Sequence, residues 1–228
     1  MIDVTVLKYI YSEFKKANTL PKNFGLFFVG AISFLIFLLL LFFETRLVFS
    51  LIDPQITFAV QQIVPRVFDA PLSLLSILGN FEVMAALLLL IALWVFRNER
   101  RIFFPLAFFG MILVFEFVGK LWLYHPGPPA NFFRYQLPFS FPAIHLETDY
   151  SFPSGHVSRT TFLAVVTAFL ATKYLKKKIH SLGVKVFCLI LVAEMVFSRV
   201  YLGEHWTSDT IGGLLLGGAM CFFAISYY

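Results

Sequence analysis

The feature that most limits the fold is a stretch of twenty residues without a charge, residues 24–43. The hydrocarbon core of a bilayer is about 30 Å thick, and an α-helix needs roughly 20 apolar residues to cross it. The stretch is longer than the apolar region of a typical secretory signal, and no small-residue cleavage pattern follows it. We therefore expect it to form a transmembrane helix that is retained.

Five further apolar stretches are long enough to be membrane spans. They are residues 72–96, 102–123, 157–175, 181–200 and 207–226. Of the 228 residues, 59% are hydrophobic and only 14% are charged, which is the composition of an integral membrane protein. The sequence thus predicts an all-α, polytopic membrane protein with six transmembrane helices in one bundle.

Two short amphipathic helices are expected outside the spans. Residues 1–23 place Leu7, Ile10 and Phe14 at helical spacing among lysines, which is typical of a helix on the membrane surface, although a frayed polar tail explains the pattern equally well. The second is expected in the first outer loop, residues 44–71. We divide the chain into an N-terminal cytoplasmic or interfacial segment, residues 1–23, and one membrane domain, residues 24–228.

The basic residues predict the orientation of the spans. Twelve of the eighteen Lys and Arg residues lie in three segments, residues 1–23, 97–101 and 173–185, which all fall on one side of a six-helix topology. Cytoplasmic loops are enriched in Lys and Arg, so both termini are expected inside a cytoplasmic (plasma) membrane. The net charge of +5 is then a topology signal, and no nucleic-acid partner is expected.

Two polar blocks interrupt the apolar pattern. Residues 198–209 read Ser-Arg-Val-Tyr-Leu-Gly-Glu-His-Trp-Thr-Ser-Asp, and residues 152–156 read Phe-Pro-Ser-Gly-His. The topology places both blocks at the outer ends of their helices, together with Lys120. Polar groups at these positions are costly unless they bind a ligand or one another. Two histidines, an arginine, a carboxylate and a helix start form a composition suited to an oxyanion.

The spacing of these residues indicates what each could do. His205 and Asp209 are four residues apart, so on a helix the carboxylate can accept a hydrogen bond from one ring nitrogen and leave the other free as a nucleophile. Ser154 and the backbone N–H of Gly155 stand where a helix is expected to begin, and helix N-termini bind anions. Arg199 offers a planar fork that fits phosphate.

Together, the two blocks and Lys120 resemble the motifs of the type 2 phosphatidic acid phosphatase family of integral-membrane lipid phosphatases. The resemblance extends from about residue 24 onward. It implies that His205 attacks phosphorus and forms a phosphohistidine, and that His156 protonates the leaving oxygen and then activates water. It also implies that Lys120 and Arg199 neutralise the phosphate oxygens, with no metal and no other cofactor.

The first family motif, a lysine followed after six residues by Arg-Pro, is only partly present. Lys120 and Pro128 match it, but Gly127 stands at the arginine position. Three other residues could supply the missing positive charge, namely Arg159, His125 and Arg134. We favour Arg159 because it lies three residues after His156, on the same helical face; its alternative role is to reach lipid headgroups.

Two carboxylates near the motifs also receive an interpretation. Glu116 can reach Lys120 one helical turn later, so we expect it to hold that lysine. Glu204 precedes His205 and could tune it, but an exposed loop carboxylate is the expectation we favour.

The sequence therefore predicts a metal-independent lipid phosphate or pyrophosphate phosphohydrolase with its site at the outer face. Its partner would be a membrane lipid phosphate, either undecaprenyl pyrophosphate or a phosphatidate-type lipid, and no obligate protein partner is expected. Two alternatives stay open. One is a phosphotransferase that uses the same site with a lipid or sugar acceptor; the other is a catalytically impaired lipid-binding membrane protein, which Gly127 keeps open.

Overall fold

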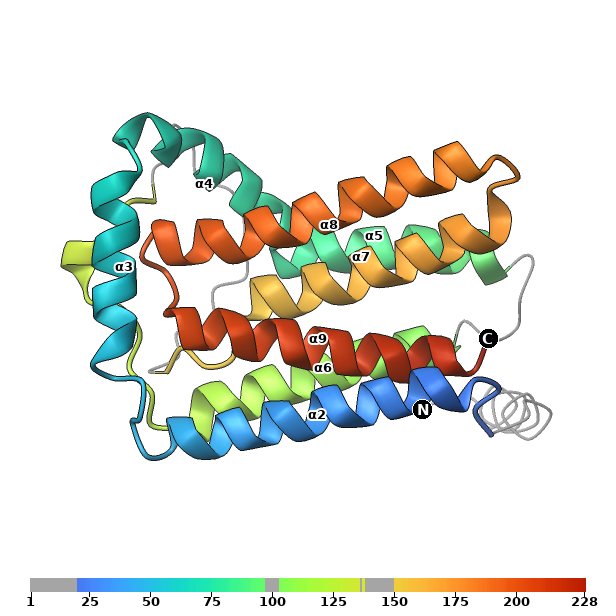
Figure 1. Ribbon diagram of the computed structural model, residues 1–228, viewed down its shortest axis with the longest axis horizontal. Coiled ribbons are helices and arrows are strands. Elements are labelled where there is room, and N and C mark those ends of the chain that lie inside the picture. The colour runs from blue at the N-terminus through green and yellow to red at the C-terminus, as the bar shows by residue number, and fades with distance from the viewer. Residues whose placement is uncertain (1–19, 97–102, 136, 138–149) are drawn as a thin grey trace, which may run out of the picture.

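The computed structural model describes residues 20–96, 103–135, 137 and 150–228, and these residues form helices and loops without a strand (Figure 1). The predicted all-α architecture is confirmed. Most of the N-terminal segment for which a surface helix is predicted lies outside the described residues. In chain order the helices are α2 (Phe24–Glu44), α3 (Ile52–Ile63), η1 (Arg66–Phe68), α4 (Asp69–Leu78), α5 (Phe81–Phe96), α6 (Phe103–Trp122), η3 (Ala130–Phe132), α7 (Gly155–Tyr174), α8 (Lys178–Tyr201) and α9 (Thr207–Ser226).

Four of these helices, α2, α6, α8 and α9, are long and apolar enough to cross a bilayer. The η1–α4 segment together with α5 makes a fifth candidate, bent by 47°. The span predicted over residues 157–175 forms α7, but polar residues in its first two turns keep it less apolar than the others. Because most of those side chains are buried against neighbouring helices, α7 does not need an apolar surface. A topology of six spans therefore stays a prediction.

The span predicted over residues 72–96 is broken into two helices. α4 ends at Leu78 and α5 begins at Phe81, with Gly79 and Asn80 between them. The backbone N–H of Gly79 donates to the carbonyl of Ser76 at 2.9 Å, which closes the last turn of α4. Glycine and asparagine favour turns over helix interiors, so the break is encoded locally within an apolar run.

α9 is the central helix, and it packs against α2, α6 and α7. A Cβ on Gly213 would lie 2.5 Å from the carbonyl oxygen of Ser154, and one on Gly217 would collide with the carbonyl of Ser158. Both glycines therefore let the backbones of α7 and α9 approach closely, as small residues do between membrane helices. The first turns of α7 and α9 consequently lie side by side.

The polar blocks meet at one end of the bundle. α7 and α9 begin there, and α6 and α8 end there (Figure 1). At the opposite end, the N–H of Lys22 donates to the carbonyl of Ser226 at 2.8 Å, which joins the start of α2 to the end of α9. The two polar blocks, which are far apart in the sequence, therefore lie together at one end of the bundle, as predicted.

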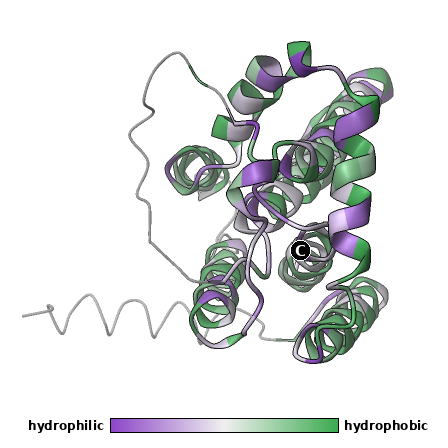
Figure 2. Cartoon of the chain, turned by 90° about the vertical axis from the view of Figure 1, so that its left-hand side faces the viewer, coloured by the Kyte–Doolittle hydropathy of each residue, from purple (hydrophilic) through white to green (hydrophobic). Residues whose placement is uncertain are grey.

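α3 crosses this end of the bundle, within the loop where one amphipathic helix is predicted. Figure 2 looks directly at this end, and hydrophilic residues are visible on parts of α3 and on the loops in front of the bundle. Asp53 and Thr57 of α3 are buried against the bundle, whereas Ile52, Phe58 and Ile63 are exposed. The helix thus turns Asp53 and Thr57 inward, while several apolar side chains point outward together with Gln55 and Gln62.

Candidate active site

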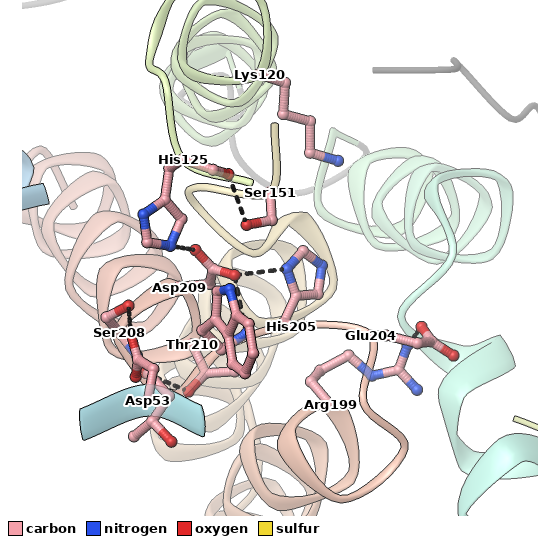
Figure 3. A network of polar contacts seen from close by, with 12 residues as sticks. Asp53, Lys120, His125, Ser151, Arg199, Glu204, His205, Ser208, Asp209 and Thr210 are labelled. Carbon is pink, nitrogen blue, oxygen red and sulfur yellow. Dashed lines mark hydrogen bonds and ion pairs between the residues drawn. The ribbon is translucent and has the colours of Figure 1, made fainter. Parts of the chain in front are cut away.

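The centre of the site is the pair His205 and Asp209. His205 lies in the turn between α8 and α9, and its Nδ1 is 3.3 Å from Oδ2 of Asp209, in the first turn of α9. The same oxygen accepts the backbone N–H of Trp206 at 2.9 Å, and Asp209 is fully buried. The other ring nitrogen of His205 points away from Asp209, toward the side on which Lys120 and Arg199 lie (Figure 3). The geometry is the one predicted for a histidine with one nitrogen held and one free.

Arg199, in the last turn of α8, has N–H donors that are not used in hydrogen bonds with the described residues. Its side chain is fully buried, and Nη1 pairs with the carboxylate of Glu204 (Figure 3). Nε and Nη2 find no hydrogen-bond partner in the part of the chain that the structure describes. Glu204 is partly buried and ion-paired, so the expectation that it is a free, exposed loop carboxylate is wrong. Burial and the charge of Glu204 raise the pKa of the neighbouring Tyr135.

His156, in the first turn of α7, is held by a residue that the sequence analysis missed. Its Nε2 lies 2.8 Å from Oδ1 of Asn80, at the break between α4 and α5. Gly79 lets the ring approach, since a Cβ there would lie 2.6 Å from Cδ2 of His156. The Gly-Asn pair inside an apolar run is a turn signal that could have pointed to this contact.

Lys120 and Arg159 share one carboxylate. Nζ of Lys120 is 3.2 Å from Oε1 of Glu116, as the spacing predicts, and Nη1 of Arg159 pairs with Oε2 of the same residue. Nη2 of Arg159 also donates to the carbonyl of Gly79 at 3.2 Å. The carboxylate of Glu116 lies so close to Gly155 that a side chain at that position would collide with it. Both cations are thereby held at the N-terminus of α7.

Ser154 immediately precedes α7, and its hydroxyl also makes no hydrogen bond with the described residues. Its backbone N–H donates to the carbonyl of Asp209 at 3.0 Å, which ties the starts of α7 and α9 together. Its Oγ is fully buried and has no hydrogen-bond partner among the described residues. The charges of Lys120, Arg159, Arg199 and His205 all act on His156, so these groups form one electrostatic cluster.

Two of the three candidates for an auxiliary cation lie elsewhere. Arg134 uses Nη1 and Nη2 on the backbone carbonyls of Val64 and Gln61, at 3.3 and 2.8 Å, and its guanidinium lies over the ring of Tyr201. It therefore joins the loop after η3 to the end of α3. His125 lies behind Asp209, on the side away from His205 (Figure 3).

His125 contacts two buried carboxylates. Its Nε2 is 3.1 Å from Oδ1 of Asp209, and its Nδ1 is 3.0 Å from Oε2 of Glu44, the last residue of α2. Burial alone would lower the pKa of His125, but the contacts with Asp209 and Glu44 outweigh burial and raise the pKa to about 10. The positive charge of His125 is thus directed to these carboxylates.

The described residues contain one set of side chains compact enough to hold a metal ion. Glu44, Asp53 and His125 are buried and offer ligand atoms that lie within 4.8 Å of one another. Asp53 is already engaged, because it accepts the N–H and the hydroxyl of Ser208 at 3.1 and 2.6 Å. A protonated His125 would offset the charge of Glu44, so an ion-pair cluster accounts for this geometry.

Comparison with known proteins places these motifs in a family. Residues 118–228 match the PAP2 superfamily. This region is a PAP2 superfamily domain. It contains Lys120 and both polar blocks, while Glu44, Asn80 and Glu116 precede it.

Curated relatives match this chain over part of their length. An undecaprenyl-diphosphatase of Sulfolobus acidocaldarius is 35% identical over 140 residues, which is 58% of each chain. Phosphatidylglycerophosphatase B of Bacillus subtilis is 34% identical over 85 residues, which is 37% of this chain and 41% of the relative. The chain thus spans less than two thirds of the length of these relatives.

A solved structure matches more of this chain. The crystal structure of a transmembrane PAP2-type phosphatidylglycerolphosphate phosphatase from Bacillus subtilis superposes with a TM-score of 0.70 at 25% identity, covering 86% of this chain and 94% of that one. The likeness to a transmembrane protein agrees with the apolar helices, so the chain is a membrane protein.

Proposed function

We propose that this PAP2 protein is a lipid phosphate or pyrophosphate phosphohydrolase that works through a phosphohistidine. The observation that carries the proposal is a set of unused donors beside the two histidines. Oγ of Ser154 and Nε and Nη2 of Arg199 are buried without a hydrogen-bond partner among the described residues. Buried donors without an acceptor are rare and destabilising, and the non-bridging oxygens of a bound phosphate would supply the acceptors.

In the first step, the free nitrogen of His205 attacks phosphorus. A bond forms between Nε2 and phosphorus while the bond from phosphorus to the leaving oxygen breaks, and His156 donates a proton to that oxygen. Asp209 accepts the hydrogen bond from Nδ1 of His205, and its negative charge stabilises the ring as the ring becomes positive. The products are the dephosphorylated lipid and the phosphohistidine.

In the second step, His156 takes a proton from water and the resulting oxygen attacks phosphorus. The bond between phosphorus and His205 breaks, which releases inorganic phosphate and restores the imidazole. Arg159 would replace the arginine of the family motif, whose position Gly127 occupies here, because Arg159 and Lys120 both form ion pairs with Glu116 at the start of α7. Three cations, Lys120, Arg159 and Arg199, would then neutralise the phosphate oxygens.

The proposed substrate is an amphiphile whose tail stays in the bilayer. With six spans and the lysine-rich end in the cytoplasm, the site would lie at the outer face of the plasma membrane. A phosphate at headgroup level could then reach His205 without transfer of the apolar tail into water. The names of the relatives support undecaprenyl pyrophosphate and phosphatidate-type lipids as substrates.

Phosphate release from undecaprenyl pyrophosphate and from phosphatidic acid, by purified full-length protein in detergent with a chelator, tests the proposal. Wild type should release phosphate, and His205→Ala should not. His180→Ala, an exposed histidine at the start of α8, is the matched control and should behave as wild type. Turnover only with an added lipid or sugar acceptor would favour the phosphotransferase, and binding without turnover would favour the impaired lipid-binding protein.

A further inference from the structure

Four side chains from four parts of the fold form a line that ends at the proposed nucleophile. Glu44 at the end of α2 faces Nδ1 of His125 at 3.0 Å, and Nε2 of His125 faces Oδ1 of Asp209 at 3.1 Å. Oδ2 of Asp209 then meets Nδ1 of His205 at 3.3 Å. Figure 3 shows the last three members, with His125 and His205 on opposite sides of the carboxylate.

His125 is fixed by contacts on its backbone as well as its ring. Its carbonyl accepts the N–H and the hydroxyl of Ser151 at 3.0 and 3.2 Å. The indole N–H of Trp206 donates to the carbonyl of the next residue, Pro126, at 2.8 Å. The ring of Phe152 packs edge-on against the imidazole, with 6.1 Å between centroids. The imidazole is therefore held in place by the same residues that lead into α7 and α9.

Charge balance also favours a positive His125 at this position. Glu44 and Asp209 are both fully buried, and a buried carboxylate is strongly unfavourable unless a positive partner offsets it. An imidazolium between them would place one ring nitrogen within about 3 Å of an oxygen of each carboxylate, as an ion pair whose N–H groups are not aligned for hydrogen bonds. Asp53 adds a further carboxylate beside Glu44, although Ser208 donates two hydrogen bonds to it. Among the described residues, the titratable groups around His125 are thus Glu44, Asp53, Asp209 and, beyond Asp209, His205.

The orientation of Asp209 depends on both of its oxygens. Oδ2 is occupied by His205 and by the N–H of Trp206, while His125 faces Oδ1. A carboxylate held at one oxygen can rotate about its terminal bond, which is a broad torsion. Rotation would lengthen the contact with Nδ1 of His205 and release the tautomer that leaves Nε2 free.

We propose that His125, backed by Glu44, is a positioning residue that holds Asp209 in the orientation in which it fixes the tautomer of His205. The inference rests on the proposed phosphohistidine function. It assigns His125 a role distinct from that of a phosphate-binding cation, because its ring faces two carboxylates and lies on the far side of Asp209 from His205. The catalytic residue is His205; His125 and Glu44 act through it.

The test compares His125→Ala, His125→Gln and Glu44→Gln with wild type and with the control His180→Ala, all full-length in detergent. Each variant is assayed for kcat and KM on the lipid that wild type turns over, across pH 6 to 10. His125→Ala should lower kcat by about tenfold to a hundredfold, the size of effect seen when an outer-shell partner of a functional side chain is removed, and should leave KM near that of wild type. His125→Gln should recover part of this loss, because its amide N–H can donate to Asp209.

Glu44→Gln separates positioning from simple structural support. Without the Glu44 carboxylate beside Nδ1, the His125 imidazolium should lose a proton more readily. The pH at which activity falls should therefore be about one to three units lower than in wild type. A group that only stabilises the fold would reduce the amount of folded protein, measured by size-exclusion chromatography, and leave the pH profile of the remainder unchanged.

Three results would overturn the inference. The first is wild-type kcat and pH profile in folded His125→Ala and Glu44→Gln. The second is an effect confined to KM, which would place His125 on the substrate. The third is stoichiometric zinc or manganese that copurifies with wild type and is lost from Glu44→Gln, because a metal on Nδ1 would replace the proton. If wild type itself releases no phosphate from either lipid, the proposed function fails instead.

Discussion

Nε2 of His156 lies 2.8 Å from the amide oxygen of Asn80, and this contact joins the start of α7 to the break between α4 and α5. Because an amide oxygen only accepts hydrogen bonds, the contact places the proton of neutral His156 on Nε2 and leaves Nδ1 as the nitrogen that exchanges protons. The break between α4 and α5 thus sets the tautomer of His156, the proposed acid–base residue.

Asn80→Ala should therefore impair catalysis more than folding. We expect kcat to fall by about tenfold, because general acid–base catalysis contributes roughly a hundredfold or more and an unheld imidazole keeps only part of it. Steady-state kinetics of the folded variant measure the effect. Asn131→Ala, at an exposed asparagine of η3, is the control and should have wild-type kcat. Equal kinetics for the two variants would contradict the role of Asn80.

Removing the carboxylate that Lys120 and Arg159 share should destabilise the protein. Glu116→Gln would leave a buried guanidinium without its ion-pair partner, and breaking such a pair costs up to about 3 kcal/mol even after allowance for the partly exposed lysine. Thermal unfolding in detergent should show a lower Tm. Glu194→Gln on the exposed surface of α8 should leave Tm unchanged. A Tm drop of the same size in both variants would mean that the shared carboxylate is not the cause.

Two glycine-to-alanine changes should have opposite effects. In Gly217→Ala the new methyl group would collide with the backbone carbonyl of Ser158, so α7 and α9 must separate and folded yield should fall. Gly183→Ala on α8 meets no atom within 4 Å and gains helix propensity, so its stability should rise by about 0.5 to 1 kcal/mol. Size-exclusion profiles and Tm give the comparison. Normal yield and Tm for Gly217→Ala would show that the two helices do not need this close approach.

The stability of the protein should depend on pH through His125. Its pKa is raised from 6.5 to about 10, so the ring binds a proton more tightly in the folded state. Its contribution is then fully present below pH about 6.5 and is lost as the pH rises toward 10. The difference in Tm between wild type and His125→Gln should shrink over that window. A difference that stays constant from pH 6 to 10 would contradict a charged His125.

Much of the fold could be predicted because it depends on local patterns. The apolar runs at residues 24–43 and 207–226 became α2 and α9 with nearly the same bounds, since the length of an uncharged run directly reflects the thickness of a bilayer. The His205–Asp209 and Glu116–Lys120 contacts could also be predicted, because residues four apart share a helical face.

The contacts that could not be predicted join residues far apart in the sequence. Glu44 was interpreted only as the first residue of the loop after the first span, yet it is fully buried against His125. Asn80 lay within a run whose hydropathy indicated one helix, and its Gly-Asn turn signal was given no weight. Glu204 differs from these two, because it lies only five residues from its partner Arg199 and reaches it where α8 ends at Tyr201 and the chain turns back. For Glu44 and Asn80, tertiary packing, and not local preference, decides the partner.

The inverted amphipathic character of α3 has a consequence for the depth of the whole molecule in the bilayer. Leu51, Ile52 and Ile63 are at least half exposed, and apolar side chains pointing outward from the end of a bundle are unfavourable in bulk water. They are favourable at the boundary between acyl chains and headgroups, where a helix lying in the plane can immerse them. The insertion of α3 into this boundary would then set the depth of the helix bundle in the bilayer. Because Ser208 at the start of α9 is hydrogen-bonded to Asp53 of α3, His205 would be kept at the level where lipid phosphates lie.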